Sequence, residues 1–195
     1  MKKLLLALFL VPALSMAQEP DYKPNIQIDT ITNRINFKGS FNVPGVDQDK
    51  LYLRAKDWFN RYFDMMHVYI SMADQTRGKI IGRGAGFGNT TTGLVKVGYA
   101  FNFNVYIAVE AGIVKYSITD FVELKGVDIE ERVPNLVSSD VYVNDEKYRN
   151  KKGEFTSAAK KRLYYIEGTG NIISSSLKET LSSDRFDSKL HSDGF

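Results

Sequence analysis

The chain of 195 residues contains no cysteine and only two histidines, His67 and His191. Without cysteine there is no disulfide, no thiolate nucleophile and no cysteine-ligated metal site. Two imidazoles are also too few for a histidine-rich metal centre, so carboxylates would have to dominate any such site. We therefore expect neither a metal nor a cofactor.

The chain also lacks an apolar run long enough to cross a bilayer, which takes about 20 residues in a helix. Its N-terminal run, residues 4–14, follows two lysines and precedes a small-x-small sequence at residues 15–17. These three features together predict a secretory signal peptide over residues 1–17, and the alternative is a buried N-terminal strand or helix. The exported protein is then expected in the periplasm or outside the cell, without an acyl anchor because no cysteine follows.

A strong excess of either charge is missing as well. Lys and Arg number 26 and Asp and Glu 23, for a formal net charge of +3. Removal of residues 1–17 takes away Lys2 and Lys3 and lowers this charge to +1. Nucleic acid rewards a strong positive excess, so no nucleic-acid partner is expected. The 178 residues that remain of 195 suit one domain behind a polar leader at residues 18–32.

Apolar and polar residues alternate in five segments, and this period of two is typical of strands with one buried face. In the segment at residues 67–74, we expect Val68, Ile70 and Met72 on one face. The other alternating segments are residues 34–43, 79–84, 96–110 and 114–124.

Two further segments carry apolar residues at helical spacing instead. The first begins at Asp47, a residue type that caps helices, and places Arg54 on its polar side. Its apolar stripe consists of Leu51, Ala55, Trp58, Phe59 and Tyr62. The second lies within residues 155–183 despite Gly168 and Gly170, which each cost about 1 kcal/mol relative to alanine. Its apolar positions are Leu163, Ile166, Ile173, Leu177 and Leu181.

The order of these elements predicts the fold class. A core at residues 33–125 has the order strand, helix, four strands, and the helix at residues 155–183 packs on it. Because each strand has one apolar face, we predict an α+β fold in which both helices cover one face of an antiparallel sheet. Residues 126–154 form a polar loop or insertion with a short strand at residues 140–143, and residues 184–195 form a flexible tail.

The most motif-like stretch is TRGKIIGRGAGFG, residues 76–88. The dinucleotide fingerprint G-x-G-x-x-G fails here, because Phe87 or Asn89 stands where the third glycine belongs. The Walker A motif fails too, since no glycine is followed by Lys and then Ser or Thr. We therefore predict a flexible loop between strands, with residues 84–93 as its mobile part.

No residue is predicted to be catalytic. The nucleophile-elbow pattern G-x-S-x-G is absent, and the carboxylates are scattered along the chain. A hydrolase based on carboxylates stays open as an alternative, because folding brings distant Asp and Glu residues together in ways that spacing does not reveal.

Three strings carry a family resemblance: DKLYLRAKDWFNRYF at residues 49–63, DQTRGKIIGRG at residues 74–84 and VEAGIVKYSITDFV at residues 109–122. They resemble the domain of unknown function 4468, a family of secreted and envelope proteins of Gram-negative bacteria described as having a TBP-like fold. The resemblance implies one half of the TATA-binding protein fold, a curved antiparallel sheet with helices on its convex side. It implies no activity, and it makes GKIIGRG a strand–loop signature of the family.

Together these features favour a non-catalytic binding or interaction module whose open sheet face meets an envelope protein, a peptide or a glycan. Mixed aromatic, amide and basic side chains suit such a surface. The alternatives are an ordinary solvated sheet surface and nucleic-acid binding by analogy with the TATA-binding protein, which the near-neutral charge and the export disfavour. The residues expected on the open face are Arg34, Asn36, Lys38, Tyr69, Asn102, Asn104, Tyr106, Lys115 and Thr119.

Overall fold

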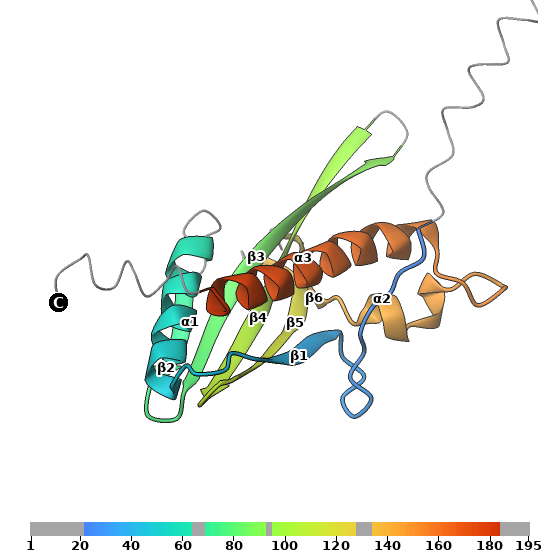
Figure 1. The fold of residues 1–195 in the computed structure, drawn as a ribbon. Helices are drawn as coiled ribbons and strands as arrows, with labels where there is room; N and C mark the ends of the chain where they lie inside the picture. Colours follow the sequence, from blue (N-terminus) through green and yellow to red (C-terminus); the bar gives the residue numbers. More distant parts are fainter. Residues whose placement is uncertain (1–21, 64–68, 93–94, 128–133, 184–195) are drawn as a thin grey trace, which may run out of the picture.

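The computed structural model describes residues 22–63, 69–92, 95–127 and 134–183 (Figure 1). Six strands form one antiparallel sheet, in the order β1-β5-β4-β3-β2, and β6 pairs with β5 beside β1. The strands are β1 (Asn36–Asn42), β2 (Tyr69–Asp74), β3 (Lys79–Thr92), β4 (Val95–Glu110), β5 (Ile113–Val127) and β6 (Pro134–Ser138). The helices are α1 (Gln48–Phe63), α2 (Val141–Asn144), the 3-10 turn η2 (Glu146–Tyr148) and α3 (Ser157–Leu181).

The two long helices α1 and α3 lie on one side of the curved sheet, as Figure 1 shows. The α+β class predicted from the order of the elements is therefore confirmed. Trp58 of α1 is only 2% exposed and its indole N–H donates to the hydroxyl of Ser176 on α3 at 3.0 Å. The five apolar positions predicted on the last helix are all buried in the same core. We call the helix-covered side of the sheet the inner face and the opposite side the outer face.

A side chain satisfies one end of each long helix, locally in α1 and from a distant residue in α3. The carboxylate of Asp47 accepts the backbone N–H of Lys50 at 2.8 Å, so this residue caps α1 as predicted. Arg54 contradicts the prediction of a polar position, because it is 1% exposed and its guanidinium donates to the carbonyl of Leu181 at 2.8 Å. The cation satisfies an end group of α3, and this tertiary contact overrides the amphipathic pattern of α1.

β3 corrects the prediction made for the glycine-rich stretch. The strand continues to Thr92 and pairs with β4 in one unbroken register, so residues 84–92 are not a loop. Its glycines at every second position face inward, where a Cβ atom at Gly84 or Gly86 would lie 2.3 or 2.4 Å from a ring atom of Phe103 or Phe101. The absent side chains make room for aromatic rings that the next strand supplies.

Two shorter predictions are also wrong. Residues 140–143 form the start of α2 and not a strand, because Tyr142 and Val143 are both buried and adjacent strand residues would face opposite sides. In β2, a bulge between Ile70 and Met72 shifts the register, so Met72 pairs with Ile81 on the outer face and is 41% exposed. His67, Val68 and His191 lie outside the described residues, as do the predicted signal peptide and tail.

Candidate functional site

The antiparallel register gathers the predicted residues on the outer face. Asn36, Thr119 and Asn104 are partners across β1, β5 and β4, and Arg83 and Tyr69 extend this row through β3 and β2. The other predicted strand residues occupy the same face, in neighbouring rows: Lys38, Asn102, Tyr106 and Lys115. Arg34 joins them from the segment before β1.

Asp120, which the sequence analysis did not single out, organises three of these residues. Its carboxylate accepts from Arg34 Nη1 at 2.9 Å, from Asn104 Nδ2 at 3.0 Å and from the hydroxyl of Tyr106 at 3.1 Å. Partial burial raises the pKa of the Tyr106 hydroxyl, and the neighbouring charge of Asp120 raises it further. We call Arg34, Asn104, Tyr106 and Asp120 the Asp120 cluster.

A β-bulge places the Asp120 side chain there. Between Asn102 and Asn104 the register of β4 against β5 shifts, and Asp120 takes a left-handed backbone conformation with φ +57°. Aspartate tolerates this conformation better than most residues because its short polar side chain bonds locally. The bulge sends the Asp120 carboxylate to the outer face, while the next residue, Phe121, is fully buried.

The remaining polar residues of the face are mostly engaged with neighbours. Lys38 Nζ lies 2.6 Å from the carboxylate of Asp29, and Lys115 Nζ lies 2.7 Å from that of Glu110. The Asp29 carboxylate accepts hydrogen bonds from Lys38 and from the backbone N–H groups of residues 31 and 32. These bonds hold the pKa of the Asp29 carboxyl well below its usual range. Since Arg34 pairs with Asp120, each of the three predicted cations faces a carboxylate. These three side chains are therefore not a cluster of free cations for phosphate groups.

A second part of the outer face is apolar. Phe87 pairs with Ala100, Ala100 with Leu124 and Leu124 with Leu136, so one row crosses four strands from β3 to β6. Phe87 is 65% exposed, Leu124 40% and Leu136 53%. A single exposed leucine is ordinary, whereas a contiguous exposed apolar patch is a feature of interaction surfaces. We call these four residues the apolar row.

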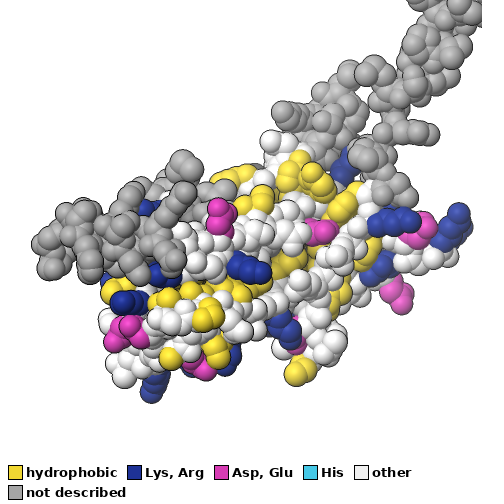
Figure 2. Space-filling model, viewed as in Figure 1, with side chains coloured by type: hydrophobic (Ala, Val, Ile, Leu, Met, Phe, Trp, Pro, Cys, Tyr) yellow, Lys and Arg dark blue, Asp and Glu magenta, His cyan; other side chains and the backbone are white. Residues whose placement is uncertain are grey.

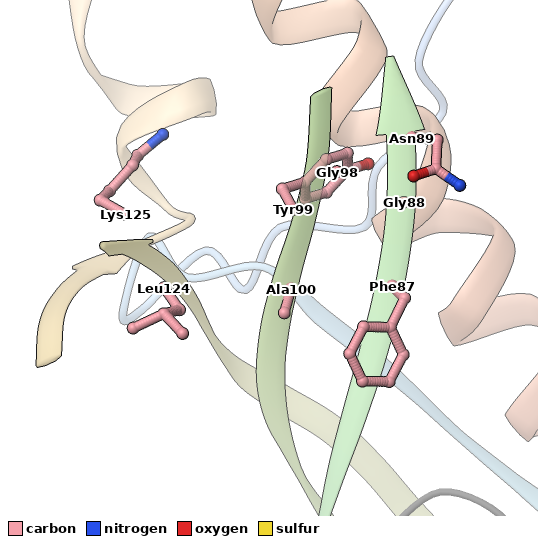
Figure 3. Close-up of a pocket in the computed structure, with 8 residues that line it drawn as sticks. All are labelled: Phe87, Gly88, Asn89, Gly98, Tyr99, Ala100, Leu124 and Lys125. Atoms are coloured by element: carbon pink, nitrogen blue, oxygen red, sulfur yellow. The ribbon is translucent and has the colours of Figure 1, made fainter. Parts of the chain in front are cut away.

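A groove of about 460 Å³ follows the apolar row (Figure 3). In Figure 3 the side chains of Phe87, Ala100 and Leu124 point the same way, whereas Lys125 points to the other side of its strand. Gly88 and Gly98 also line the groove, together with Asn89 and Tyr99. Gly88 pairs with Tyr99 and Gly98 with Asn89, so the two glycines lie in adjacent rows and the hollow exposes backbone as well as apolar side chains.

Behind the groove, a buried ionic network joins the sheet to α2 and α3. Glu123 is 3% exposed; its carboxylate accepts from the hydroxyl of Tyr142 and lies 3.1 Å from Arg162 Nε and 3.0 Å from Lys125 Nζ. The Arg162 guanidinium also lies over the ring of Tyr99, 4.2 Å from its centroid. Burial and the bond to Glu123 raise the pKa of the Tyr142 hydroxyl. The contacts of this buried carboxylate tie β5, α2 and α3 together.

The described part of the chain shows neither a metal-binding cluster nor a helix able to span a membrane. Among these residues no group of three or more His, Cys, Asp or Glu side chains is arranged to hold a metal ion. None of the helices in this part has both the length and the apolar character needed to span a bilayer.

Comparison with known proteins identifies the fold. Residues 37–123 match the family described as "Domain of unknown function (DUF4468) with TBP-like fold". The crystal structure of a DUF4468 family protein from Bacteroides ovatus ATCC 8483 superposes with a TM-score of 0.66 at 13% identity, over 80% of this chain and 91% of that one. A TBP-like protein from Parabacteroides distasonis ATCC 8503 gives a TM-score of 0.50 at 6% identity, over 76% and 96%. No curated protein sequence matches the chain.

The resemblance inferred from sequence strings is thus confirmed. The matched span runs from β1 to β5 and includes the Asp120 cluster except Arg34. Identities this low show the fold alone and carry no ligand or activity across.

Proposed function

Since the core resembles a TBP-like family of unknown function, we propose that the protein is an exported, non-catalytic binding module that holds a partner protein on the outer face of its sheet. The observation that carries this proposal is the apolar row, in which Leu124 and Leu136 are exposed as a pair and Phe87 is exposed on the other side of Ala100. Protein interfaces combine an apolar centre with a polar rim, and the Asp120 cluster supplies a pre-organised rim on the same face.

The contacts within the rim support a protein partner over a nucleic acid. Arg34, Lys38 and Lys115, the three cations predicted on this face, each face a carboxylate already, so a phosphate backbone would gain little charge neutralisation from them. An apolar side chain of a partner would instead remove Leu124 and Leu136 from water, at roughly 25 cal/mol per Å² of apolar surface.

Export supports the same kind of partner. The signal-peptide pattern of residues 1–17 would deliver the chain to the cell envelope, where it meets proteins and not the chromosome.

Site-specific crosslinking in the native host tests the proposal. A photo-reactive amino acid at Asn102, exposed between the apolar row and the Asp120 cluster, is expected to trap one defined envelope protein. The same group at Lys56, on the exposed side of α1, is expected to trap none. Leu136→Asp should abolish the Asn102 product, whereas Leu53→Asp, a 40% exposed leucine of α1, should leave it intact. An Asn102 product that survives Leu136→Asp would refute the role of the apolar row.

A further inference from the structure

A second groove lies on the helix side of the sheet edge and shares Phe87 with the apolar row of the outer face. β2 pairs with β3 only as far as the partners Tyr69 and Arg83, whereas β3 continues to Thr92. Among the described strands, none pairs with this distal part of β3 on the side away from β4. Figure 1 shows β3 running on past β2 toward its hairpin with β4, while α3 passes in front of the sheet.

At every second residue of this edge, the backbone N–H and C=O groups point away from β4. The carbonyl of Ile81 accepts from the hydroxyl of Ser71 on β2, and the carbonyl of Asn89 accepts from the hydroxyl of Tyr165 on α3 at 2.6 Å. Since strand residues alternate in direction, the N–H and C=O groups of Ala85 and Phe87 point to the same side. These groups are a template for one more strand.

The opposite wall of the groove is a face of α3. The cavity measures about 440 Å³ and is lined by Phe87 from β3 and by Tyr164, Tyr165 and Ile172 from α3. Phe87, Tyr164 and Ile172 are 65%, 56% and 61% exposed, so three large apolar side chains surround a strand edge with which no described strand pairs. Figure 2, which views the helix side, shows hydrophobic surface interspersed with single charged groups rather than one charged field.

One acidic group marks the end of the groove. The Glu167 carboxylate accepts from the hydroxyl of Tyr22 and from the backbone N–H of Asn25 at 3.0 Å. Both donors are neutral, and among the described residues no cation forms an ion pair with Glu167. Its negative charge therefore complements a basic residue of an incoming chain.

We propose that this groove binds an extended peptide segment of a partner protein, which adds as a strand to the free edge of β3. Main-chain hydrogen bonds to Ala85 and Phe87 provide affinity, and alternate apolar side chains of the peptide pack between Tyr164 and Ile172. A lysine or arginine at one end of the segment meets Glu167. An extended backbone satisfies the edge groups of β3 and fits between a strand and a helix.

Fluorescence anisotropy with a labelled octapeptide, Lys-Thr-Val-Thr-Val-Thr-Val-Thr, tests the proposal on the purified protein. A version with the lysine at the other end covers both orientations. We expect saturable binding for at least one of them, and at least about tenfold weaker binding when a central valine is replaced by proline, which removes a donor. Backbone amide exchange at Ala85 and Phe87 should slow by about tenfold or more in the complex. Equal binding of the proline peptide, or no binding of either orientation, would overturn the proposal.

Three protein variants locate the bound peptide. Ile172→Asp, at an exposed position of α3, should weaken binding by about tenfold, while Leu136→Asp on the outer face should change it less than about twofold. Glu167→Gln should remove the preference for a lysine peptide over its glutamine counterpart. Binding lost with Leu136→Asp and kept with Ile172→Asp would overturn this inference and leave the proposed outer-face function standing.

Discussion

The guanidinium of Arg54 on α1 donates to the backbone carbonyl of Leu181 at 2.8 Å, although 127 residues separate the two in sequence. The contact joins the first long helix to the C-terminus of the last one. It places a positive charge where the α3 dipole is negative, in a position that is 1% exposed to solvent.

Arg54→Met should therefore lower the free energy of unfolding by about 2–4 kcal/mol, because it leaves a buried carbonyl unsatisfied and removes a buried charged donor. Urea unfolding followed by circular dichroism measures the change. Lys56→Met, at an exposed position of the same helix, is the matched control and should change the free energy by less than about 0.5 kcal/mol. Equal effects of the two variants would contradict the assigned role of Arg54.

Two glycines of α3 should respond in opposite ways to alanine. A Cβ atom at Gly168 meets no atom within 4 Å, so Gly168→Ala should stabilise the protein by about 0.5–1 kcal/mol through helix propensity. A Cβ atom at Gly170 would lie 2.5 Å from the ring of Phe37 on β1, so Gly170→Ala should destabilise it by about 1–3 kcal/mol. Thermal unfolding of both variants checks the signs, and a shared sign would show that Gly170 does not set the distance of α3 from β1.

The inward glycines of β3 make a related prediction. Gly86→Ala should cost about 1–3 kcal/mol, because the buried Phe101 ring has no free space into which to move. In the double variant with Phe101→Leu the two losses should be clearly less than additive, since the shorter side chain vacates the position of the new methyl group. Ala85→Val on the outer face is the control and should be close to neutral. Simple additivity of Gly86→Ala and Phe101→Leu would argue against a steric cause.

Stability should decline in alkaline solution. Burial and the hydrogen bond to Glu123 raise the pKa of the Tyr142 hydroxyl. Partial burial of Lys125 lowers the pKa of its ammonium group, but the hydrogen bonds of this group to Tyr142 and Glu123 outweigh that effect and raise the pKa. Both groups keep their protons in the folded chain and lose them on unfolding above about pH 10, so their contribution is complete below that pH and is lost as pH rises. Urea unfolding between about pH 8 and pH 11 should show the decline, and Tyr142→Phe should flatten it. An unchanged slope in Tyr142→Phe would contradict this assignment.

Export is the prediction on which the proposed location depends. We expect the mature protein in the native host to begin at Gln18, as measured by mass spectrometry of its N-terminal peptide. Leu8→Arg interrupts the apolar run and should leave the unprocessed precursor in the cytoplasm. A wild-type protein that retains residues 1–17 would refute both the signal peptide and the envelope location.

Much of the fold could be predicted because local patterns report burial directly. The alternation around Phe101 and Phe103 and the helical spacing of Leu51, Ala55 and Trp58 each identify a face that must leave water. The glycine stretch misled the prediction because glycine is read as a loop signal, yet its glycines recur at every second position, the period of a strand. That period was the available clue to β3 and to the exposed Phe87.

The candidate site was predictable only in part. Alternation placed Asn104, Tyr106 and Thr119 on the outer face, but it did not reveal Asp120, whose orientation comes from a bulge. Leu124 and Leu136 were missed because their exposure depends on the pairing of β5 with β6, and the segment that contains β6 carries no clear period in sequence.

Residue periodicity by itself determined both long helices, most of the strands and the buried side of most of these elements, because apolar residues recur along the chain with the period of the element whose face they bury. Only the tertiary structure decided the strand register, the bulges, the free edge of β3 and the contacts of Arg54 and Asp120. These depend on residues far apart in sequence, and their geometry is set by packing and hydrogen bonding that exist only once the sheet and its helices have come together.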